Sequence, residues 1–344
     1  MTEWKECLLG DLITFQRGHD LPKSKMSGNG YPVVGSNGII GFHNEYTTEY
    51  PSITVGRSGN VGKPYIVYGR SWSHNTSLYI KEFKGTDPVF IYYFLQTLDL
   101  GNYAGGSAVP TLNRNHIHLL NVRVPADISI QKIIANTLKV LDDKIDKNTA
   151  INKNLEQQAQ VIFLKMFPDI FSASASSSFQ NLIEFSNGRK RPETIGDIPV
   201  YGGNGVLAYT NQSNAENCVI IGRVGAYCGN TFLCPEKCWT SDNAIQAKSK
   251  NEASPLFIYY LLRNASLPSR HIGTGQPLMT QAILNAIPVN EPSTQEIKSF
   301  INICTPLHET IFANEKQNIS LAILRDTLLP KLMSGELDVS DLDI

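Results

Sequence analysis

An arginine between glycines occurs twice in this chain of 344 residues, each time after a short run of β-forming residues. The first copy is Gly-Arg-Ser-Gly around Arg57, and the second is Gly-Arg-Val-Gly around Arg223. Glycines permit a tight turn and a close approach of the backbone to a partner. A guanidinium can read the edge of guanine or hold a phosphate. The pattern favours contact with nucleic acid, and the alternative is an arginine that pairs with a carboxylate in its own domain.

A second polar pattern follows a tryptophan in both halves of the chain. Small polar residues come after Trp72 and Trp239, namely Ser73, His74, Asn75, Thr240, Ser241 and Asn243. Asparagine reads adenine, and a Ser or Thr hydroxyl can contact various bases. The two indoles themselves are expected in the core rather than stacked on bases. A residue that is repeated in both copies is as easily a requirement of the fold as of the function.

Residues that read bases should differ between the two copies if the copies read different sequences. Polar and basic residues that differ between the copies therefore join the predicted DNA-binding set, namely Lys23, Lys25, Asn60, Lys63, Arg189, Lys190, Arg191 and Tyr227. Arg70 and the turn asparagines Asn37 and Asn204 complete the set. No catalytic residue is predicted.

Four cysteines form the main competing signal, a metal site. Cys218, Cys228, Cys234 and Cys238 lie close together in the sequence, but their spacing lacks the paired two-residue gaps of zinc ribbons and knuckles. The positions 167 residues earlier hold no cysteine, being Pro51, Val61, Val67 and Ser71. A fold that forms in one copy without metal should not need it in the other. The pattern therefore favours buried free thiols over structural zinc, and disulfides are disfavoured in a cytoplasmic chain.

Two near-motifs for cofactor chemistry fail on spacing. The segment 56–64 resembles a phosphate-binding loop, but its glycines are wrongly spaced and Pro64 replaces the metal-binding hydroxyl. The segment Asp87–Phe90 is similar to the Asp-Pro-Pro-Tyr type of amino-methyltransferases, but the second proline and a glycine-rich cofactor loop are missing. Nucleotide binding and methyl transfer by this chain are therefore disfavoured. The remaining enzyme hypothesis is an unrecognised site among the histidines and cysteines.

The elements that must position these residues are duplicated. Pro32–Gly38 returns as Pro199–Gly205, and Phe90–Leu95 returns as Phe257–Leu262, each 167 residues later. Short β-rich runs separated by Gly, Asn and Pro lie around them, at Ile53–Val55, Tyr65–Tyr68, Ser77–Ile80 and Asn121–Val124. These runs predict short strands, and the stretch from Phe90 to Leu98 predicts a helix. Two copies of one α+β unit suit a molecule that meets two similar sites on one partner.

Each copy ends in a heptad seam that predicts a long helix. The first seam consists of Ile134, Leu138, Leu141, Ile145, Asn148, Asn152, Leu155, Ala159, Ile162 and Met166. The second lies 166 residues later and consists of Phe300, Cys304, Leu307, Ile311, Asn314, Asn318, Leu321, Arg325, Leu328 and Leu332. The asparagines of the two seams either pair and fix the register of two packed helices, or mark where the seam opens to solvent. Pro306 predicts a start or a kink in the second helix.

Composition and charge narrow the class of protein. With 42% hydrophobic and 18% charged residues and no long apolar run, we expect a soluble, cytoplasmic, globular chain without a membrane span. The net charge of −1 hides an uneven distribution, because no Asp or Glu occurs from Tyr50 to Lys81 or between Glu252 and Glu291. Locally basic faces fit a nucleic-acid groove, and the alternative is ordinary solvated surface.

The order of these features, duplicated, resembles the specificity subunit of type I restriction-modification enzymes over the whole chain. The resemblance rests on Ser36–Gly38, Gly203–Gly205, the Gly-Arg-x-Gly turns, the Phe-Ile-Tyr-Tyr helices, the strand exits at Val124-Pro125 and Ile287-Pro288, the helix starts at Gln131 and Gln295, and Leu328–Leu337. It implies two globular target recognition domains, each reading one half of a split DNA site. Two long antiparallel coiled-coil helices would separate them in a tandem pseudo-twofold arrangement.

The resemblance also implies partners and a division of labour. Methyltransferase subunits, two in number, would dock on the helices and methylate adenine at N6 with S-adenosylmethionine, and a restriction subunit driven by ATP and Mg²⁺ would complete the larger complex. This chain is then a non-catalytic subunit that binds double-stranded DNA and needs no cofactor or metal of its own. The alternative is a stand-alone DNA-binding adaptor for another modification enzyme.

Five segments follow from this interpretation. A first recognition domain is expected at 1–127, a first helix at 128–171, a second recognition domain at 172–290, a second helix at 291–335 and an acidic tail at 336–344. The serine-rich segment 172–178 is expected to be a flexible linker.

Overall fold

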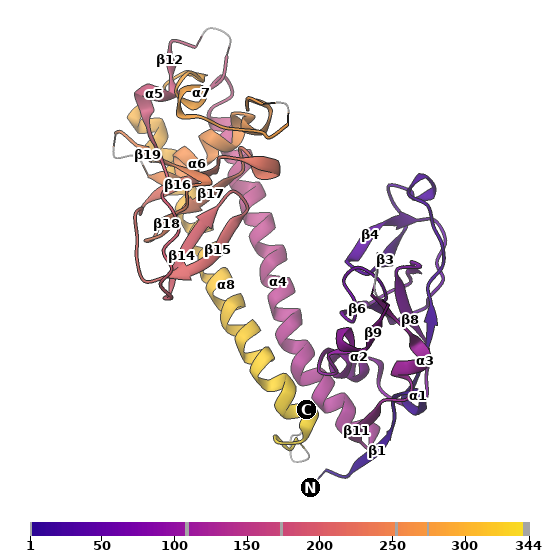
Figure 1. The fold of residues 1–344 in the computed structure, drawn as a ribbon. Helices are drawn as coiled ribbons and strands as arrows, with labels where there is room; N and C mark the ends of the chain where they lie inside the picture. The colour runs from indigo at the N-terminus through magenta and orange to yellow at the C-terminus, as the bar shows by residue number, and fades with distance from the viewer. Residues whose placement is uncertain (1, 107–109, 173–174, 252–253, 274, 340–344) are drawn as a thin grey trace. The chain divides into compact units, whose positions relative to one another are not determined.

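The structure is a computed structural model that describes residues 2–106, 110–172, 175–251, 254–273 and 275–339. The chain divides into two compact units, and each contains part of both long helices. Unit 1 comprises 1–148 and 316–344, and unit 2 comprises 149–315 (Figure 1). None of the described helices is both long enough and apolar enough to cross a membrane.

Two small sheets form the β part of unit 1. The four-stranded antiparallel sheet has the order β2 (Ile13–Arg17), β8 (Ser77–Phe83), β5 (Ser52–Gly56) and β6 (Pro64–Val67). The three-stranded sheet has the order β4 (Gly38–His43), β3 (Tyr31–Gly35) and β7 (Trp72–Ser73), and β7 pairs in parallel with β3. Short pairs are formed by β1 (Trp4–Leu8) with β11 (Asn121–Pro125) and by β9 (Ala104–Gly105) with β10 (Thr111–Leu112).

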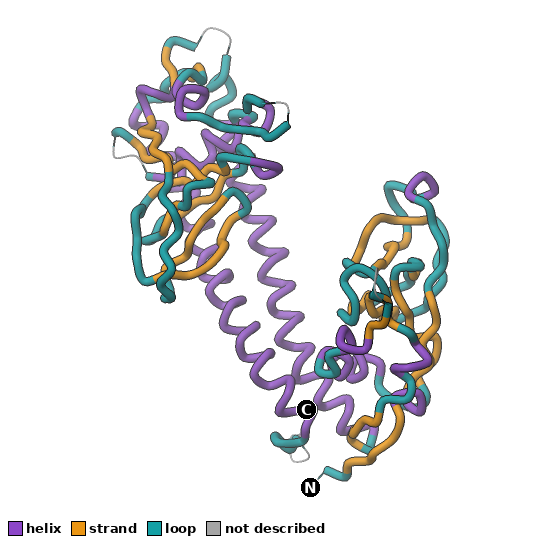
Figure 2. Tube along the Cα trace, viewed as in Figure 1, coloured by secondary structure: helices purple, strands orange, loops and turns teal. Residues whose placement is uncertain are grey.

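Short helices connect and cover these strands, as the tube in Figure 2 shows. They are α1 (Leu9–Leu12), α2 (Pro88–Gln96), α3 (Arg114–Ile117) and the 3₁₀ turns η1 (Lys23–Lys25) and η2 (Leu100–Tyr103). Helix α2 begins where predicted, because the Asp87 carboxylate accepts a hydrogen bond from the Phe90 amide at 2.8 Å and Pro88 occupies the first helical turn. Its buried face joins the core of the unit.

Unit 2 repeats this element order. Its four-stranded sheet is β13 (Ile183–Asn187), β19 (Ala244–Ser249), β16 (Cys218–Gly222) and β17 (Thr231–Cys234), and its three-stranded sheet is β15 (Gly205–Thr210), β14 (Ile198–Gly202) and β18 (Trp239–Thr240). The remaining elements are β12 (Ser177–Ser178) paired with β20 (Pro288–Val289), α5 (Phe179–Leu182), α6 (Pro255–Asn264), α7 (Gln281–Asn285), η3 (Gly225–Tyr227) and η4 (Leu267–Ser269). The prediction of an α+β fold in two copies is confirmed.

The two long helices are α4 (Ile128–Met166) and α8 (Thr294–Ser334). Helix α8 does not start at Pro306, because Ser293 and Glu296 cap it earlier: the Ser293 amide donates to the Glu296 carboxylate at 2.8 Å. The helix then continues through Pro306. Of the expected linker 172–178, Ala173 and Ser174 lie outside the described residues, as do residues 340–344 of the acidic tail.

Each unit uses one half of both long helices to close its core. In unit 1, Ile134 and Leu138 of α4 lie in one cluster with Leu332 of α8. In unit 2, Phe163 of α4 stacks edge-on against Phe300 of α8, with ring centroids 5.5 Å apart. The early part of α4 thus meets the late part of α8 in unit 1, and the reverse holds in unit 2, so the helices are antiparallel.

The asparagines of the seam pair across the helices. In unit 1, the Asn148 amide donates to Gln317 at 2.8 Å and to Asn318 at 2.9 Å. In unit 2, Asn314 donates to Asn152 at 2.8 Å, and Asn152 donates to the Ile311 carbonyl at 3.2 Å. Asn148 is fully buried. The seam is therefore not open to solvent at Asn148, whereas Asn152, Asn314 and Asn318 are half-buried. The hydrogen bonds needed for register control are present.

Candidate nucleic-acid interface

Three turns of unit 1 are held together by hydrogen bonds from backbone amides. The Arg57 amide donates to the Thr76 carbonyl at 2.8 Å, and the Ser36 amide donates to the Thr76 hydroxyl at 3.2 Å. We call the segments 36–38, 57–63 and 74–76 turn cluster 1. It brings together the predicted residues Asn37, Arg57, Asn60, Lys63, His74 and Asn75.

Two of these side chains meet at an aromatic ring. The Asn60 amide donates to the Tyr65 hydroxyl at 3.2 Å, and the Lys63 ammonium lies 5.8 Å from the centre of the same ring. Tyr65 was not among the predicted residues. The only sequence signal for it was its place two residues after Lys63 at the start of β6, which any core tyrosine could share.

Unit 2 builds the same arrangement from equivalent segments, 203–205, 223–227 and 241–243, which we call turn cluster 2. The Arg223 amide donates to the Asn243 carbonyl at 2.9 Å, and the Ser241 amide donates to the Tyr201 carbonyl at 2.9 Å. The Arg223 guanidinium also donates to the Asp242 carbonyl at 3.3 Å. Cluster 2 therefore presents Asn204, Arg223, Tyr227 and Asn243 on the frame that carries Asn37, Arg57 and Asn60 in unit 1.

The glycines before the two arginines serve the loops themselves. A Cβ at Gly56 would clash with the Asn60 carbonyl, and a Cβ at Gly222 would clash with the Tyr227 carbonyl. The interpretation that these two glycines make room for a partner is therefore wrong, because the chain already fills that space. They fix the path of the backbone that presents Arg57 and Arg223.

Within the described ranges, neither arginine forms an ion pair. The alternative of an internal carboxylate partner is not supported for Arg57 or Arg223. Both side chains are half-buried at the surface, whereas Asn37, Asn60, Lys63, Asn204, Tyr227 and Asn243 are exposed. Cationic and amide groups are therefore open to solvent on both turn clusters.

Three predicted residues must be withdrawn. Ser73 on β7 and Thr240 on β18 are 0% exposed within the small sheets, and Ser241, directly after β18, is 2% exposed. The Ser73 hydroxyl is bonded to that of Thr48 at 2.7 Å. These hydroxyls cannot reach a base in this structure, so their repetition reflects the fold.

His74 and Asn75 have internal hydrogen bonds. The ring nitrogens of His74 lie 3.0 Å from the Thr76 hydroxyl and 3.3 Å from the Leu21 carbonyl, and Asn75 donates to Asp20. These contacts tie the loop after β2 to turn cluster 1. Lys23 and Lys25 lie exposed in that loop, on η1.

The loop after β13 occupies the equivalent place in unit 2. The Arg189 amide donates to the Thr240 carbonyl at 3.0 Å, and the Trp239 indole donates to the Arg189 carbonyl at 3.3 Å. Arg189, Lys190 and Arg191 are all exposed. Both tryptophans are half-buried supports of such a loop, since Trp72 packs edge-on against His19 and His43.

Arg70 lies apart from this arrangement. Its guanidinium pairs with Glu49 at 2.9 Å and stacks 4.5 Å from the centre of the Tyr46 ring. These contacts raise its pKa, with the hydrogen bond to Glu49 as the main cause. Because Glu49 compensates its positive charge, Arg70 is a weaker candidate than Lys63 for a contact with DNA phosphate.

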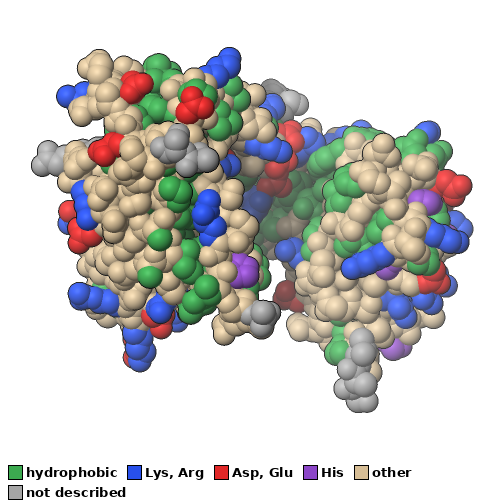
Figure 3. Space-filling view, turned by 90° about the horizontal axis from the view of Figure 1, so that it is seen from above, with side chains coloured by type: hydrophobic (Ala, Val, Ile, Leu, Met, Phe, Trp, Pro, Cys, Tyr) green, Lys and Arg blue, Asp and Glu red, His purple; other side chains and the backbone are tan. Residues whose placement is uncertain are grey.

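The visible face of the molecule carries its charge in separate places. Figure 3 shows Lys and Arg side chains on each unit as separate spots beside hydrophobic side chains, not as one continuous basic patch. Exposed apolar residues recur at the edge strand of both small sheets, namely Ile39, Ile40 and Phe42 on β4 and Val206, Leu207 and Tyr209 on β15. This repeated feature was not predicted from the sequence, where its signal was the shared hairpin after each turn asparagine.

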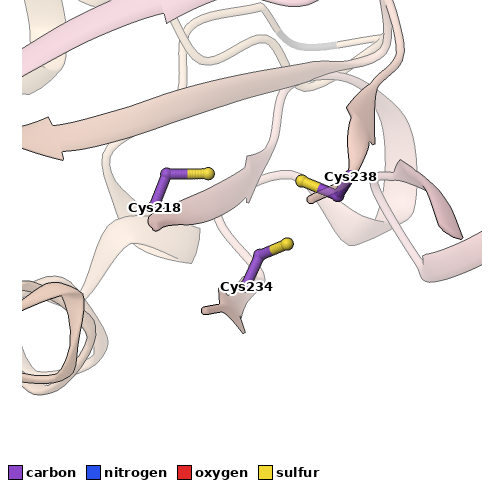
Figure 4. A group of neighbouring side chains, drawn as sticks. All are labelled: Cys218, Cys234 and Cys238. Atoms are coloured by element: carbon purple, nitrogen blue, oxygen red, sulfur yellow. The ribbon is translucent and has the colours of Figure 1, made fainter. Parts of the chain in front are cut away.

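Three of the four clustered cysteines come together, and the fourth does not. The sulfur atoms of Cys218, Cys234 and Cys238 all lie within 4.8 Å of one another (Figure 4). Cys228 belongs to a different core cluster, where its thiol donates to the Arg223 carbonyl at 3.4 Å. All four are buried, as predicted.

Comparison with known proteins agrees with this architecture. The family model for the type I restriction modification DNA specificity domain matches residues 1–157 and again 181–322. The type I restriction enzyme MjaIX specificity subunit of Methanocaldococcus jannaschii is 25% identical over 303 residues, 74% of this chain and 70% of that protein. The EcoprrI specificity subunit of Escherichia coli is 25% identical over 157 residues, 44% of this chain and 39% of that protein. The crystal structure of a type I restriction-modification S subunit from M. genitalium has a similar fold, with 19% identity, a TM-score of 0.65 and 96% coverage of both chains.

Proposed function

Because the chain belongs to the family of type I restriction-modification DNA specificity domains, with two regions that match it, we propose that it recognises a bipartite DNA site. Each unit would read one half of the site through its turn cluster. The observation that carries this proposal is the repeated backbone frame with different exposed side chains. Asn60 and Lys63 stand on one copy, and Tyr227 and Asn243 stand on the other.

The chemistry of the clusters supports this division of contacts. Lys63 and the basic loop residues Lys23, Lys25 and Arg189–Arg191 are suited to phosphates, which position a protein on the duplex without reading sequence. Arg57, Asn37 and Asn60 in unit 1 carry the donor patterns that distinguish guanine and adenine in the major groove. Arg223, Asn204 and Asn243 offer the same patterns in unit 2.

The catalytic steps would belong to partner subunits. This chain would be a non-catalytic recognition subunit, and methyltransferase subunits that use S-adenosylmethionine would modify the site it selects, with a restriction subunit using ATP and Mg²⁺ in the larger complex. Exposed apolar side chains on the long helices support docking there, namely Val140, Ile319, Ile323 and Leu324 in unit 1 and Ile151, Val161, Leu164 and Ile303 in unit 2.

Methylation mapping with the partner subunit tests this function. The chain and a type I methyltransferase subunit are incubated with a library of DNA sites, alone and together, and methylated adenines are located by sequencing. We expect methylation only when both proteins are present, at a site made of two short specific sequences with an unread gap. Methylation at one uninterrupted sequence would contradict the bipartite proposal. If the chain alone bound its DNA site specifically, and as tightly as it does together with the methyltransferase subunit, the stand-alone adaptor would be favoured.

A further inference from the structure

We propose that Cys218, Cys234 and Cys238 form a three-thiolate binding site for a zinc-type divalent cation in unit 2. The proposal goes beyond DNA recognition, because it concerns a structural ion within the domain. It rests on the position of the sulfur atoms and on the comparison of the two units.

The three cysteines come from separate places in the fold. Cys218 begins β16, Cys234 ends β17 directly opposite it, and Cys238 precedes β18. Figure 4 shows their sulfur atoms pointing into one common space. Sulfurs bound to zinc at about 2.3 Å in tetrahedral geometry lie about 3.8 Å apart. Since no pair here is farther apart than 4.8 Å, each needs to close by at most about 1 Å.

Unit 1 shows how the same place is filled without cysteines. The strand pairing matches Cys218 with Ser52, not with Pro51 as the constant spacing of 167 suggested, and it matches Cys234 with Val67. Cys238 matches Ser71 because both form an equivalent isolated β-bridge. Cys238 bridges to Ala215, shortly before β16, and Ser71 bridges to Thr48, shortly before β5. In unit 1 the hydroxyls of Ser52 and Ser71 are hydrogen-bonded at 2.5 Å beside an aliphatic side chain. In unit 2 thiols stand in place of both hydroxyls and of the aliphatic Val67 side chain. Two cysteines would be enough to replace the hydrogen-bonded serine pair, so the third thiol needs another explanation.

The surroundings suit a bound cation with anionic ligands. The side chains around the sulfurs are apolar, including Ala215, Ile220 and Ala244, with Tyr201 and Phe232 packed against them. Binding of one Zn²⁺ releases the three thiol protons to the buffer and leaves a site of net charge −1. Lys248 on β19 stands next to Cys218 across the strand pair, because their neighbours Ala247 and Val219 are paired. With three protein ligands, the fourth position of the tetrahedron would be held by water.

The test uses the full-length chain, purified with a thiol-free reductant. Its zinc content is measured by elemental analysis, and the ion is then replaced by Co²⁺ to record thiolate-to-cobalt absorption. We expect one zinc per chain, intense cobalt–thiolate bands, and a lower thermal transition after a chelator removes the ion. Absence of retained zinc together with absence of cobalt–thiolate bands would overturn the proposal. So would a disulfide among the three cysteines in freshly isolated protein.

Unit 1 supplies the matched variants. The triple variant Cys218→Ser, Cys234→Val and Cys238→Ser copies the metal-free solution of unit 1 and should fold while losing zinc, the cobalt bands and the chelator effect. Cys228→Val, which copies Val61, should keep all three. Metal binding that persists in the triple variant, or disappears in Cys228→Val while that variant remains folded, would place the ion elsewhere and overturn the assignment.

Discussion

Arg57 and Arg223 are held by their backbones, and within the described residues neither guanidinium pairs with a carboxylate. The Arg223 guanidinium donates to the Asp242 carbonyl of its own turn cluster. Each amide is bonded to the neighbouring turn, and each preceding glycine is fixed by the loop that follows it. Because the backbone is fixed in this way, a change of side chain should alter binding without unfolding the loop.

Charge reversal tests the role of these side chains. We expect Arg57→Glu, Arg223→Glu and Lys63→Glu each to weaken DNA binding by the assembled complex and to flatten its dependence on salt, by about one unit of slope for each lost phosphate contact. Lys5→Glu, on the exposed side of β1, makes the same charge change away from turn cluster 1 and should leave the slope unchanged. Binding measured by fluorescence anisotropy at several salt concentrations gives the slopes. Identical slopes in all four variants would remove these residues from the interface.

His308 gives unit 2 a predictable response to acid. Burial lowers its pKa to about 4, and its ring nitrogen lies 2.8 Å from the Tyr260 hydroxyl. The unfolded chain binds a proton near pH 6.5, so the stability from neutral His308 is complete above that pH and is lost as the pH falls from about 6.5 towards 4. We expect a loss on the order of 1–3 kcal/mol across this window.

The response can be assigned with two variants. Neighbouring Glu156 has a lowered pKa despite its burial, because Arg263 and Tyr259 donate hydrogen bonds to it, and it therefore titrates in more acidic solution. His308→Gln should make the free energy of unfolding of unit 2 less dependent on pH between about 7 and 5, whereas the exposed His116→Gln should not. Urea unfolding of both variants and the parent at the two pH values measures the difference. Equal pH dependence in His308→Gln and the parent would contradict the argument.

At the scale of the elements, the asparagines are the polar exception in the helix seam. Asn148→Leu removes the side-chain amide that donates hydrogen bonds to the oxygens of Gln317 and Asn318. We therefore expect a loss of about 1–3 kcal/mol in the free energy of unfolding. Replacing Asn148, Asn152, Asn314 and Asn318 together by leucine should restore the stability but admit other helix registers. Thermal unfolding checks the first expectation, and cross-linking of cysteine pairs placed in and out of register checks the second. A quadruple variant that cross-links only in register would show that the asparagines do not set it.

The phenolic groups of the repeated Phe-Ile-Tyr-Tyr helices anchor each sheet region to the long helices. In unit 1, Tyr93 donates to Asp142 of α4 at 2.6 Å, and Arg325 of α8 donates to the same carboxylate at 2.6 Å. In unit 2, Tyr259 donates to Glu156 of α4 at 2.7 Å. The globular part of unit 1 is thus bound to α4 at a carboxylate that also pairs with α8, and that of unit 2 is bound to α4 through Tyr259 and to α8 through Tyr260, whose hydroxyl lies 2.8 Å from His308. These contacts fix the orientation of each globular part on its own half of the helices.

Local patterns predicted these elements well, and long-range pairing decided what they missed. Helix α2 was predictable because Asp87 and Pro88 mark its start and its apolar residues mark its length. The two-residue strand β7 was not, because its parallel pairing with β3 leaves no periodic pattern, and Ser73 therefore looked like a surface residue. The sequence showed four cysteines close together, but which three of them meet depends on the strand pairing that sets Cys218 opposite Cys234.

At the scale of the whole molecule, the duplication predicts modular specificity. We expect that replacing residues 1–127 by the equivalent domain of another specificity subunit will change one half of the recognised site and leave the other half and the gap unaltered, because unit 2 keeps its own turn cluster. Methylation mapping of the chimera with the same partner subunit tests this. An exchange that alters both halves, or neither, would contradict one reader per unit.

Each unit contains one half of α4 and one half of α8, and this determines how the protein should respond to cleavage of its backbone. Residues 316–334 of α8 supply Leu332 and Met333 to the core of unit 1, while the rest of unit 1 lies at the other end of the sequence. A single protease nick in the segment 172–176 should therefore yield two fragments that copurify and unfold together, since the first fragment alone lacks those core residues. Separate expression of the fragments should give poorly folded pieces that recover on mixing. Unit 1 is not a contiguous stretch of sequence, although unit 2 is, so fragment complementation, rather than truncation, is the means of taking unit 1 apart.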